Sequence, residues 1–316
     1  MIDGIRKAPR RRPRISEQQA SIEFAPPAGP LRKLVSDRRK VLPQYVMPKR
    51  GLTAFAGHVA SRERGATTTR LVRWFVRKYG VDMGEAAVSD VAAYRSFNDF
   101  FTRALKEGAR PLADADLVCP VDGTISQFGR IEHDQILQAK GHRYSTTALV
   151  GGDHELAARF HDGSFATLYL SPKDYHRIHM PCDGVLTRMI HVPGALFSVN
   201  PTTARGVPGL FARNERVVCV FENERGPWVL VLVGATIVGS MATVWHGVVN
   251  PPRPGQVRAW RYEDRIVQLA QGDEMGRFLL GSTVVLLFPP GLLRFNPAWV
   301  PGGAIRMGEA MASVGS

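Results

Sequence analysis

From Pro111 onward the chain is divided into short apolar runs that are separated by turns rich in Gly, Pro and Asp. These runs lie at residues 117–121, 125–131, 165–170, 184–192, 217–221, 228–233, 235–241 and 283–288. Apolar runs of this length between turn residues are typical of buried strands with short connections. The sequence therefore predicts a β-rich domain over residues 111–316.

The part of the chain before Pro111 has a different character. Residues 1–80 hold 19 Lys/Arg against 5 Asp/Glu, whereas the remaining residues are close to neutral. Residues 1–40 are rich in Arg and Pro, which predicts a disordered basic tail. Residues 41–110 have a helical pattern. We therefore expect an α+β protein in which N-terminal amphipathic helices precede the β-rich domain.

One stretch of the helical segment is amphipathic, with two faces that differ in chemistry. At 100° per residue, the apolar face holds Leu71, Val72, Phe75, Val76 and Tyr79, and the opposite face holds Arg70, Arg73 and Arg77. A helix of this kind can lie in a membrane interface, or it can pack on the protein as an ordinary surface helix. We expect residues 41–110 to associate with an anionic membrane, with Leu71, Phe75 and Tyr79 in the acyl boundary.

Other features limit the class of protein. The three cysteines have no ligand-like spacing, which argues against a disulfide framework or a zinc site and fits a reducing cytoplasm. The longest apolar stretch, residues 229–238, is too short to span a bilayer. Ser96 precedes three aromatic residues, Phe97, Phe100 and Phe101, which predicts an N-capped short helix that docks its rings on the protein. We expect a peripheral protein on the cytoplasmic side of the cell membrane.

A Gly-Ser bond stands directly before the last apolar run. A hydroxyl at Ser282 can attack the carbonyl of Gly281 if the backbone bends toward it, and Gly281 has no Cβ to obstruct the approach. The amide would become an ester, and β-elimination would cut the chain and leave dehydroalanine at the new amino terminus, which hydrolyses with loss of ammonia to a pyruvoyl group. The preceding residues 274–278 have a helical pattern. Gly-Ser before a strand is, on its own, usually a simple turn.

Two further stretches carry chemistry that such a reaction needs. His176 and His179 stand three residues apart before Pro181, a spacing that predicts one helical turn with both rings on a shared face. Histidine has a suitable pKa for taking a hydroxyl proton at neutral pH, whereas a metal site lacks a third ligand nearby. Asp122 follows an apolar run and is either a turn former or the carboxylate that orients a histidine.

Several motifs occur together in an order that resembles the bacterial phosphatidylserine decarboxylase family. They are PVDG around Asp122, YLSPKDYHRIHMPCDG, LFSVNP, NERVVCVFEN, VGATIVGSM and GRFLLGST, with FNDFFTRALKEGARPL and ILQAKGHRYS. The resemblance covers residues 42–295, and the histidine run and the LGST motif are highly specific together. The basic tail of residues 1–40 has no counterpart in shorter family members.

The resemblance implies self-cleavage at Gly281–Ser282 into residues 1–281 (the β chain) and residues 282–316 (the α chain). Asp122, His179 and Ser282 match the processing triad. His176 matches the family histidine that assists decarboxylation.

The resemblance also implies a cofactor and partners. Ser282 becomes the covalent pyruvoyl group, which forms a Schiff base with the amine of phosphatidylserine, and loss of CO2 gives phosphatidylethanolamine. The two chains remain as a heterodimer, and a further homo-oligomer is left open. We expect no metal and no nucleic acid. A serine hydrolase is less favoured because no Gly-x-Ser-x-Gly elbow surrounds Ser282, and a nucleic-acid-binding protein would explain only the basic tail.

Overall fold

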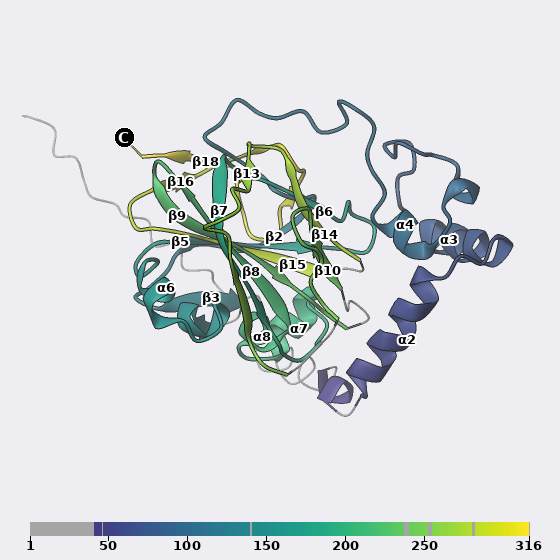
Figure 1. The fold of residues 1–316 in the computed structure, drawn as a ribbon, viewed down its shortest axis with the longest axis horizontal. Helices are drawn as coiled ribbons and strands as arrows, with labels where there is room; N and C mark the ends of the chain where they lie inside the picture. Colours follow the sequence, from purple (N-terminus) through teal and green to yellow (C-terminus); the bar gives the residue numbers. More distant parts are fainter. Residues whose placement is uncertain are drawn as a thin grey trace, which may run out of the picture.

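The computed structural model describes residues 41–45, 47–139, 141–236, 240–251, 255–279 and 282–315. In these residues a β-rich body is joined to a group of helices that precede it in the chain (Figure 1). The predicted α+β class is confirmed. The predicted tail of residues 1–40 lies outside the described residues.

An antiparallel sheet of nine strands forms the centre of the described body. Its order is β12-β7-β8-β9-β15-β5-β2-β17, and β13 pairs with β7. In chain order the strands are β2 (Gly123–Arg130), β5 (Ser164–Leu170), β7 (Gly184–Val192), β8 (Arg216–Asn223), β9 (Gly226–Val233), β12 (Arg258–Arg261), β13 (Gln268–Leu269), β15 (Ser282–Phe288) and β17 (Ala304–Ile305).

Both faces of this sheet are covered, which explains why its strands have continuous apolar runs. In β15, Val284, Leu286 and Phe288 point into one core, and Val285 and Leu287 point into the other. A strand with a single buried face would alternate apolar and polar residues instead. Burial on both faces therefore accounts for the continuous run at residues 283–288.

Smaller sheets and short helices cover the two faces. One face carries the sheet β11-β10-β14-β6, formed by β6 (Arg177–His179), β10 (Met241–Thr243), β11 (Gly247–Val248) and β14 (Glu274–Phe278). The other packs on α5 (Thr146–Leu149), α6 (His154–Ala158), α7 (Pro201–Gly206) and α8 (Leu210–Arg213). The remaining strands are β1 (Leu117–Val118), β16 (Leu293–Phe295) and β18 (Ala310–Val314), which form one sheet, and β3 (Gln135–Ala139) and β4 (His142–Ser145), which form another.

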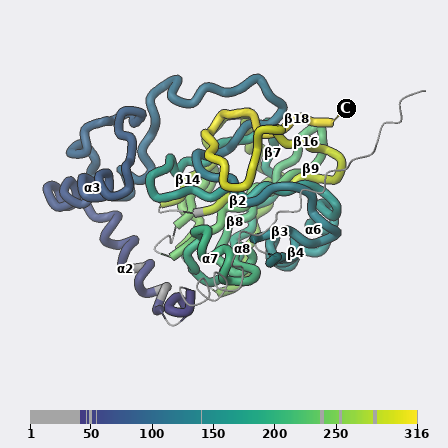
Figure 2. Tube along the Cα trace, turned by 180° about the vertical axis from the view of Figure 1, so that it is seen from behind, coloured from purple at the N-terminus to yellow at the C-terminus, as the bar shows by residue number. Residues whose placement is uncertain are grey.

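The C-terminal segment contributes strands to more than one sheet of this body. β15 lies between β9 and β5, β17 pairs with β2, and β18 pairs with β1. Figure 2 shows the end of the chain, in yellow, lying across β2. Residues after Ser282 therefore contribute a central strand and an edge strand to one sheet.

The helices that precede the body have a core of their own. They are α2 (Lys49–Ser61), α3 (Ala66–Tyr79), the 3-10 helix η1 (Val91–Ala93) and α4 (Phe97–Phe101). The predicted cap of α4 is confirmed, because the Ser96 hydroxyl accepts a hydrogen bond from the backbone N–H of Asp99 at 3.1 Å. Phe97, Phe100 and Phe101 are buried, as the sequence predicted.

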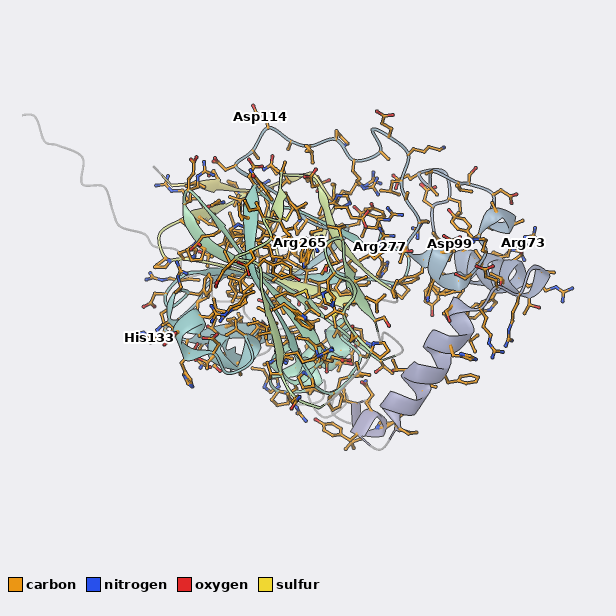
Figure 3. All side chains as sticks on the ribbon, in the orientation of Figure 1. Arg73, Asp99, Asp114, His133, Arg265 and Arg277 are labelled. Atoms are coloured by element: carbon orange, nitrogen blue, oxygen red, sulfur yellow. The ribbon has the colours of Figure 1, made fainter. Side chains whose placement is uncertain are left out.

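Part of the apolar face of α3 is buried in the protein, which corrects the predicted insertion of Phe75 into the acyl boundary, whereas Tyr79 on the same face is 37% exposed. Val72 is fully buried, and Phe75 is only 8% exposed. The Phe75 ring lies 5.0 Å from that of Phe97 and 5.8 Å from that of Phe100. Burying these side chains against α4 removes more apolar surface from water than one helix alone could. The face on which Arg73 lies is therefore the outer one (Figure 3).

Two other predicted elements differ from the structure. Residues 274–278 form strand β14 and not a helix, because they pair with β6 and β10 and their backbone hydrogen bonds run between strands. The predicted strand at 235–241 is not continuous: β9 ends at Val233 and β10 begins at Met241, while residues 237–239 lie outside the described ones.

Candidate active site

The central sheet brings two of the predicted site segments to the same edge. Ser282 is the first residue of β15 and lies opposite Leu170, the last residue of β5. On the other side of β5, strand β2 begins directly after Asp122. Thr283 and Thr124 both pair with Tyr169 on β5. Asp122 and Ser282 therefore flank the end of β5, and the chain that leaves β5 carries both histidines. Gly281 and the Ser282 side chain lie outside the described residues.

Gly123 allows the close approach that sets Asp122 beside β5. A Cβ at this position would lie 2.3 Å from the carbonyl oxygen of Tyr169, which is far inside van der Waals contact. A larger residue would push β2 away from β5 and displace Asp122 with it. The close packing of β2 against β5 therefore requires the glycine of the PVDG motif.

The Asp122 carboxylate is buried and bound to a cation. Arg110 donates from Nε to Oδ1 at 2.9 Å and from Nη2 to Oδ2 at 2.5 Å, and the backbone N–H of Met307 donates to Oδ1 at 2.9 Å. The same Nη2 lies 2.7 Å from Glu85. The pKa of Arg110 is raised, chiefly by its hydrogen bond to Asp122. No hydrogen bond joins Asp122 to His179 in the described part of the chain.

His179 is oriented by a backbone carbonyl. Its Nδ1 lies 2.8 Å from the oxygen of Gly272, and because a carbonyl can only accept, Nδ1 carries the proton. Its Nε2 is then unprotonated and accepts from the Tyr175 hydroxyl at 3.0 Å. Burial lowers the pKa of His179, while the charge of Asp122 acts weakly in the opposite direction. His179 is therefore a neutral imidazole whose basic nitrogen is Nε2.

His176 has the same tautomer as His179, but its side chain is more deeply buried. Its Nδ1 donates to the carbonyl of Asp174 at 2.8 Å, and its ring lies 4.1 Å from that of Phe101. Its Nε2 is buried without a hydrogen-bond partner among the described residues. Burial lowers the pKa of His176 to about 3, so the ring is neutral. The Phe278 N–H donates to the His176 carbonyl at 3.0 Å, which holds this residue against the end of β14.

The two histidines do not share a helical turn, contrary to the prediction. Arg177 to His179 form strand β6, and the Arg177 guanidinium bonds the Glu274 carboxylate of β14 at 2.8 Å. Strand pairing here satisfies the backbone groups that a helical turn would have satisfied internally. No group of three His, Cys, Asp or Glu side chains suited to a metal ion occurs within the described ranges.

A pocket of about 320 Å³ opens beside Asp122. Its wall includes Ser171 and Tyr175 from the segment after β5, and Arg103 from the segment after α4. Tyr175, whose hydroxyl also binds His179, links this pocket to the predicted base, while neither His176 nor His179 is among the described residues that line it.

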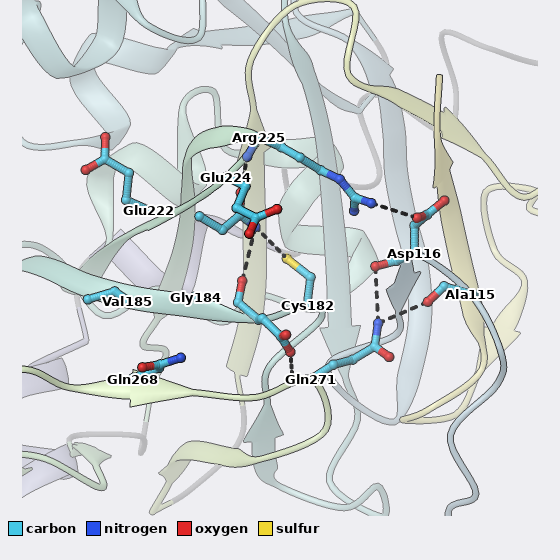
Figure 4. A pocket seen from close by; sticks show the side chains of 12 residues that line it. Ala115, Asp116, Cys182, Gly184, Val185, Glu222, Glu224, Arg225, Gln268 and Gln271 are labelled. Atoms are coloured by element: carbon cyan, nitrogen blue, oxygen red, sulfur yellow. Dashed lines mark hydrogen bonds and ion pairs between the residues drawn. The ribbon is translucent and has the colours of Figure 1, made fainter. Parts of the chain in front are cut away.

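A second pocket, of about 610 Å³, is lined by none of the predicted site residues (Figure 4). Burial raises the pKa of Cys182 in its wall to about 12, so this thiol is a poor nucleophile at neutral pH. Gln271 donates to the carbonyls of Ala115, Asp116 and Pro181, as the dashed lines in Figure 4 show in part. These bonds fix the turn that presents Gly272 to His179.

Three residues that contact the site were not predicted from the sequence: Arg110, Tyr175 and Gly272. Arg110 and Tyr175 both stand inside motifs that resemble the family, so position alone could have flagged them. Gly272 acts through its backbone oxygen, and a sequence gives no signal for such a contact.

Comparison with known proteins identifies the family of this chain. The family model described as Phosphatidylserine decarboxylase matches residues 97–313, and a model described as PSD matches residues 39–80. A protein named phosphatidylserine decarboxylase proenzyme from Variovorax paradoxus is 75% identical over 280 residues, which cover 89% of this chain and 99% of the relative. Proteins of the same name from a Polaromonas species and from Dechloromonas aromatica are 75% and 71% identical, over 88% of this chain and 99% of each relative. The chain belongs to the phosphatidylserine decarboxylase family.

Proposed function

We propose that this chain cuts itself between Gly281 and Ser282 and then decarboxylates phosphatidylserine to phosphatidylethanolamine through a pyruvoyl group made from Ser282. The observation that carries the proposal is the convergence of three segments at one sheet edge: the end of β5 with its two histidines, the start of β2 with Asp122, and the start of β15. Similar proteins are named as proenzymes, which supports a precursor that is processed.

For self-cleavage, His179 acts as the general base. Its Nε2 carries the basic lone pair of the neutral ring, because Nδ1–H is committed to Gly272. The Ser282 hydroxyl gives its proton to Nε2, and the oxygen attacks the carbonyl carbon of Gly281. The Tyr175 hydroxyl must leave Nε2 first, since both hydroxyls need the same lone pair. Asp122 assists from a distance, because its negative charge favours the imidazolium that forms.

For decarboxylation, His176 is the proton carrier. The orphaned Nε2 of His176 fits a reacting group beside the end of β14, because a buried acceptor without a partner is costly unless function requires it. The pyruvoyl carbonyl, once formed, supplies an electron sink for the electron pair that CO2 leaves behind. His176 Nε2 takes up a proton from the substrate and returns it to the product carbon. Its burial makes the imidazolium a strong acid, which favours the return.

The same proposal places the enzyme on a membrane surface through the outer face of α3. Trp74 on this face is 51% exposed, and Lys78 Nζ lies 4.6 Å from its ring centre. A groove of about 520 Å³ is lined by Arg70, Arg73, Trp74, Arg77 and Lys78. Cations around an exposed indole suit an interface of anionic headgroups, where tryptophan is favoured.

Helix α2 extends this surface. Phe55 is 67% exposed and Leu52 is 38% exposed, so both present apolar groups to the surroundings. Across the ranges described here, no helix combines the length and the apolar character needed to pass through a bilayer. Contact by exposed side chains of α2 and α3 is therefore the mode of attachment that we propose.

Self-cleavage is tested by comparing the wild-type chain with Ser282→Ala on a denaturing gel and by intact mass. The wild type should give two chains, with the smaller one blocked by a pyruvoyl group, and Ser282→Ala should give one inactive chain. Ser313→Ala is the matched control, because Ser313 is exposed on β18 and should be cut as in the wild type. An active preparation with one uncut chain and an ordinary serine would refute the proposal.

A further inference from the structure

The pocket beside Asp122 has an unusual balance of charged groups. Arg110 is neutralised by Asp122 and Glu85, and Glu85 also pairs with Arg306 at 3.1 Å. Two other cations in the wall, Arg103 and Lys173, form no ion pair with a carboxylate among the described residues. The wall also holds the carboxylates of Asp82 and Asp174, so it has four cations and four carboxylates, and what sets Arg103 and Lys173 apart is the lack of a direct ion pair among the described residues.

Arg103 is the more informative of these two cations because it is buried. Arg103 is 5% exposed. Its Nη2 donates to the Lys173 carbonyl at 3.1 Å, and its guanidinium carbon lies 5.5 Å from the centre of the Phe100 ring. Its Nε has no hydrogen-bond partner in the described part of the chain. Burying a guanidinium without a carboxylate is strongly unfavourable. A partner that arrives with a negative charge would compensate this cost.

We propose that Arg103, with Lys173 at the mouth of the pocket, binds the phosphodiester of the lipid substrate. The inference deepens the proposed function, on which it rests, by naming the headgroup subsite. When the guanidinium turns toward the pocket, its unused Nε–H, which is buried in the present arrangement, donates to one phosphate oxygen. Lys173, which is exposed, adds a mobile point charge.

The phosphodiester suits this site better than the serine carboxylate does. Decarboxylation removes the negative charge of the carboxylate, so a cation held against it would stabilise the ground state more than the transition state. The phosphodiester keeps its charge through the whole reaction. Binding energy gained there holds the headgroup in place without opposing the loss of CO2.

The size and position of the pocket agree with a headgroup. Its volume of about 320 Å³ is at the lower end for ligand pockets, which range over about 300–1,000 Å³. Its wall also includes Gly80 and Asp82, which follow the C-terminal end of α3. A lipid headgroup in this pocket would therefore sit next to the helix whose outer face we propose to contact the membrane.

The test uses the processed enzyme and two soluble probes that compete with substrate: glycerophosphoethanolamine, which carries the phosphodiester, and ethanolamine, which does not. Arg103→Gln should weaken inhibition by glycerophosphoethanolamine by about 10–100-fold, as expected for a lost charge-assisted pair. Inhibition by ethanolamine should change less than about 2-fold. Arg95→Gln is the control, because Arg95 lies outside the pocket and its side chain is 77% exposed.

Processing is followed on the same samples, so a failure of self-cleavage is seen separately from a failure of headgroup binding. If Arg103→Gln does not fold or process, Lys173→Glu decides, because Lys173 is exposed and a reversed charge at the mouth should also weaken the phosphodiester probe selectively. Equal weakening of both probes, or no change for glycerophosphoethanolamine in a processed variant, would overturn the inference.

Discussion

The Tyr175 hydroxyl lies 3.0 Å from Nε2 of His179 and uses the lone pair that an attacking serine needs. Burial raises the pKa of Tyr175 to about 12, so the hydroxyl keeps its proton and remains a donor. His179 is thus held in the right tautomer, but its basic nitrogen is occupied. Two hydroxyls, Tyr175 and Ser282, compete for one nitrogen in the mechanism that we propose.

Tyr175→Phe should therefore leave self-cleavage at or above the wild-type rate, because the competing donor is removed while the ring that packs at this site is kept. A time course of precursor and product bands after synthesis in a cell-free system measures the rate. A decrease of 10-fold or more would show that the Tyr175 hydroxyl helps to move the proton and does not merely occupy Nε2.

The two histidines should separate the two reactions. His179→Ala should block processing, because the only proposed base is lost. His176→Ala should still be cut, yet decarboxylate about 10²–10⁴-fold more slowly, which is the usual contribution of general acid–base catalysis. Gel bands and CO2 release report on the two steps in one preparation. A His176→Ala enzyme that is cut and fully active would leave His176 a packing residue.

Asp122→Asn should slow cleavage and also destabilise the precursor. The change leaves Arg110 with Glu85 alone, and breaking a buried ion pair costs about 3–5 kcal/mol. Chemical denaturation in a Ser282→Ala background measures the loss of stability in a single uncut chain. Arg143→Gln is a suitable control, since it breaks an exposed pair with Glu132. A loss no larger than that of the control would mean that the buried pair contributes little.

The stability of the precursor should depend on pH through His176. Its pKa is about 3 in the folded chain and near the ordinary 6.5 when unfolded. Between these values the unfolded state binds more protons, so stability falls as the pH falls from about 6.5 toward about 3. In a Ser282→Ala background, His176→Gln should reduce this slope by up to about 1.4 kcal/mol per pH unit. Denaturation curves with equal slopes for both chains would contradict this.

Membrane binding should depend on the outer face of α3. Replacing Arg70, Arg73 and Arg77 by Gln removes three charges, each worth about 1 kcal/mol near an anionic surface, so affinity for phosphatidylserine vesicles should fall about 10²-fold. Self-cleavage should continue. The control replaces Arg130, Arg143 and Arg159 on the body, which are also exposed. Liposome sedimentation that weakens equally for both triple variants would indicate an unspecific charge effect.

Some of this architecture followed from the sequence because it depends on local patterns. The run at residues 284–288 is apolar throughout, and such a run indicates burial on both sides of a strand. The cap at Ser96 is likewise a local feature. The predicted surroundings of Phe75 were wrong for a reason that the pattern of one helix does not reveal. The periodicity of α3 places Phe75 on the apolar face, but the position of α4 determines that protein covers this side chain and not lipid.

The sequence proposed the residues of the candidate site, but it did not give their hydrogen-bond partners. The order of motifs pointed to Asp122, His176, His179 and Ser282 together. Their partners lie elsewhere in the chain: Arg110 and Met307 bind Asp122, and Gly272 binds His179. A backbone carbonyl leaves no pattern in the sequence, and the position of Tyr175 in a motif does not show which atom it binds, so this network had to come from the structure.

Strand β15 begins at the residue that follows the proposed cleavage bond, and it is hydrogen-bonded on both sides, to β9 and to β5. In the mechanism that we propose, the sheet is assembled before the scissile bond reaches its base, so self-cleavage would mark the completion of folding. The proposed cut would release no fragment, because the new chain end belongs to a strand that is already paired on both sides. Expressing the two chains separately would demand insertion of a central strand between β9 and β5. On this proposal the uncut precursor acts as its own assembly template, and the cut that activates it would prevent the mature protein from refolding by the same route.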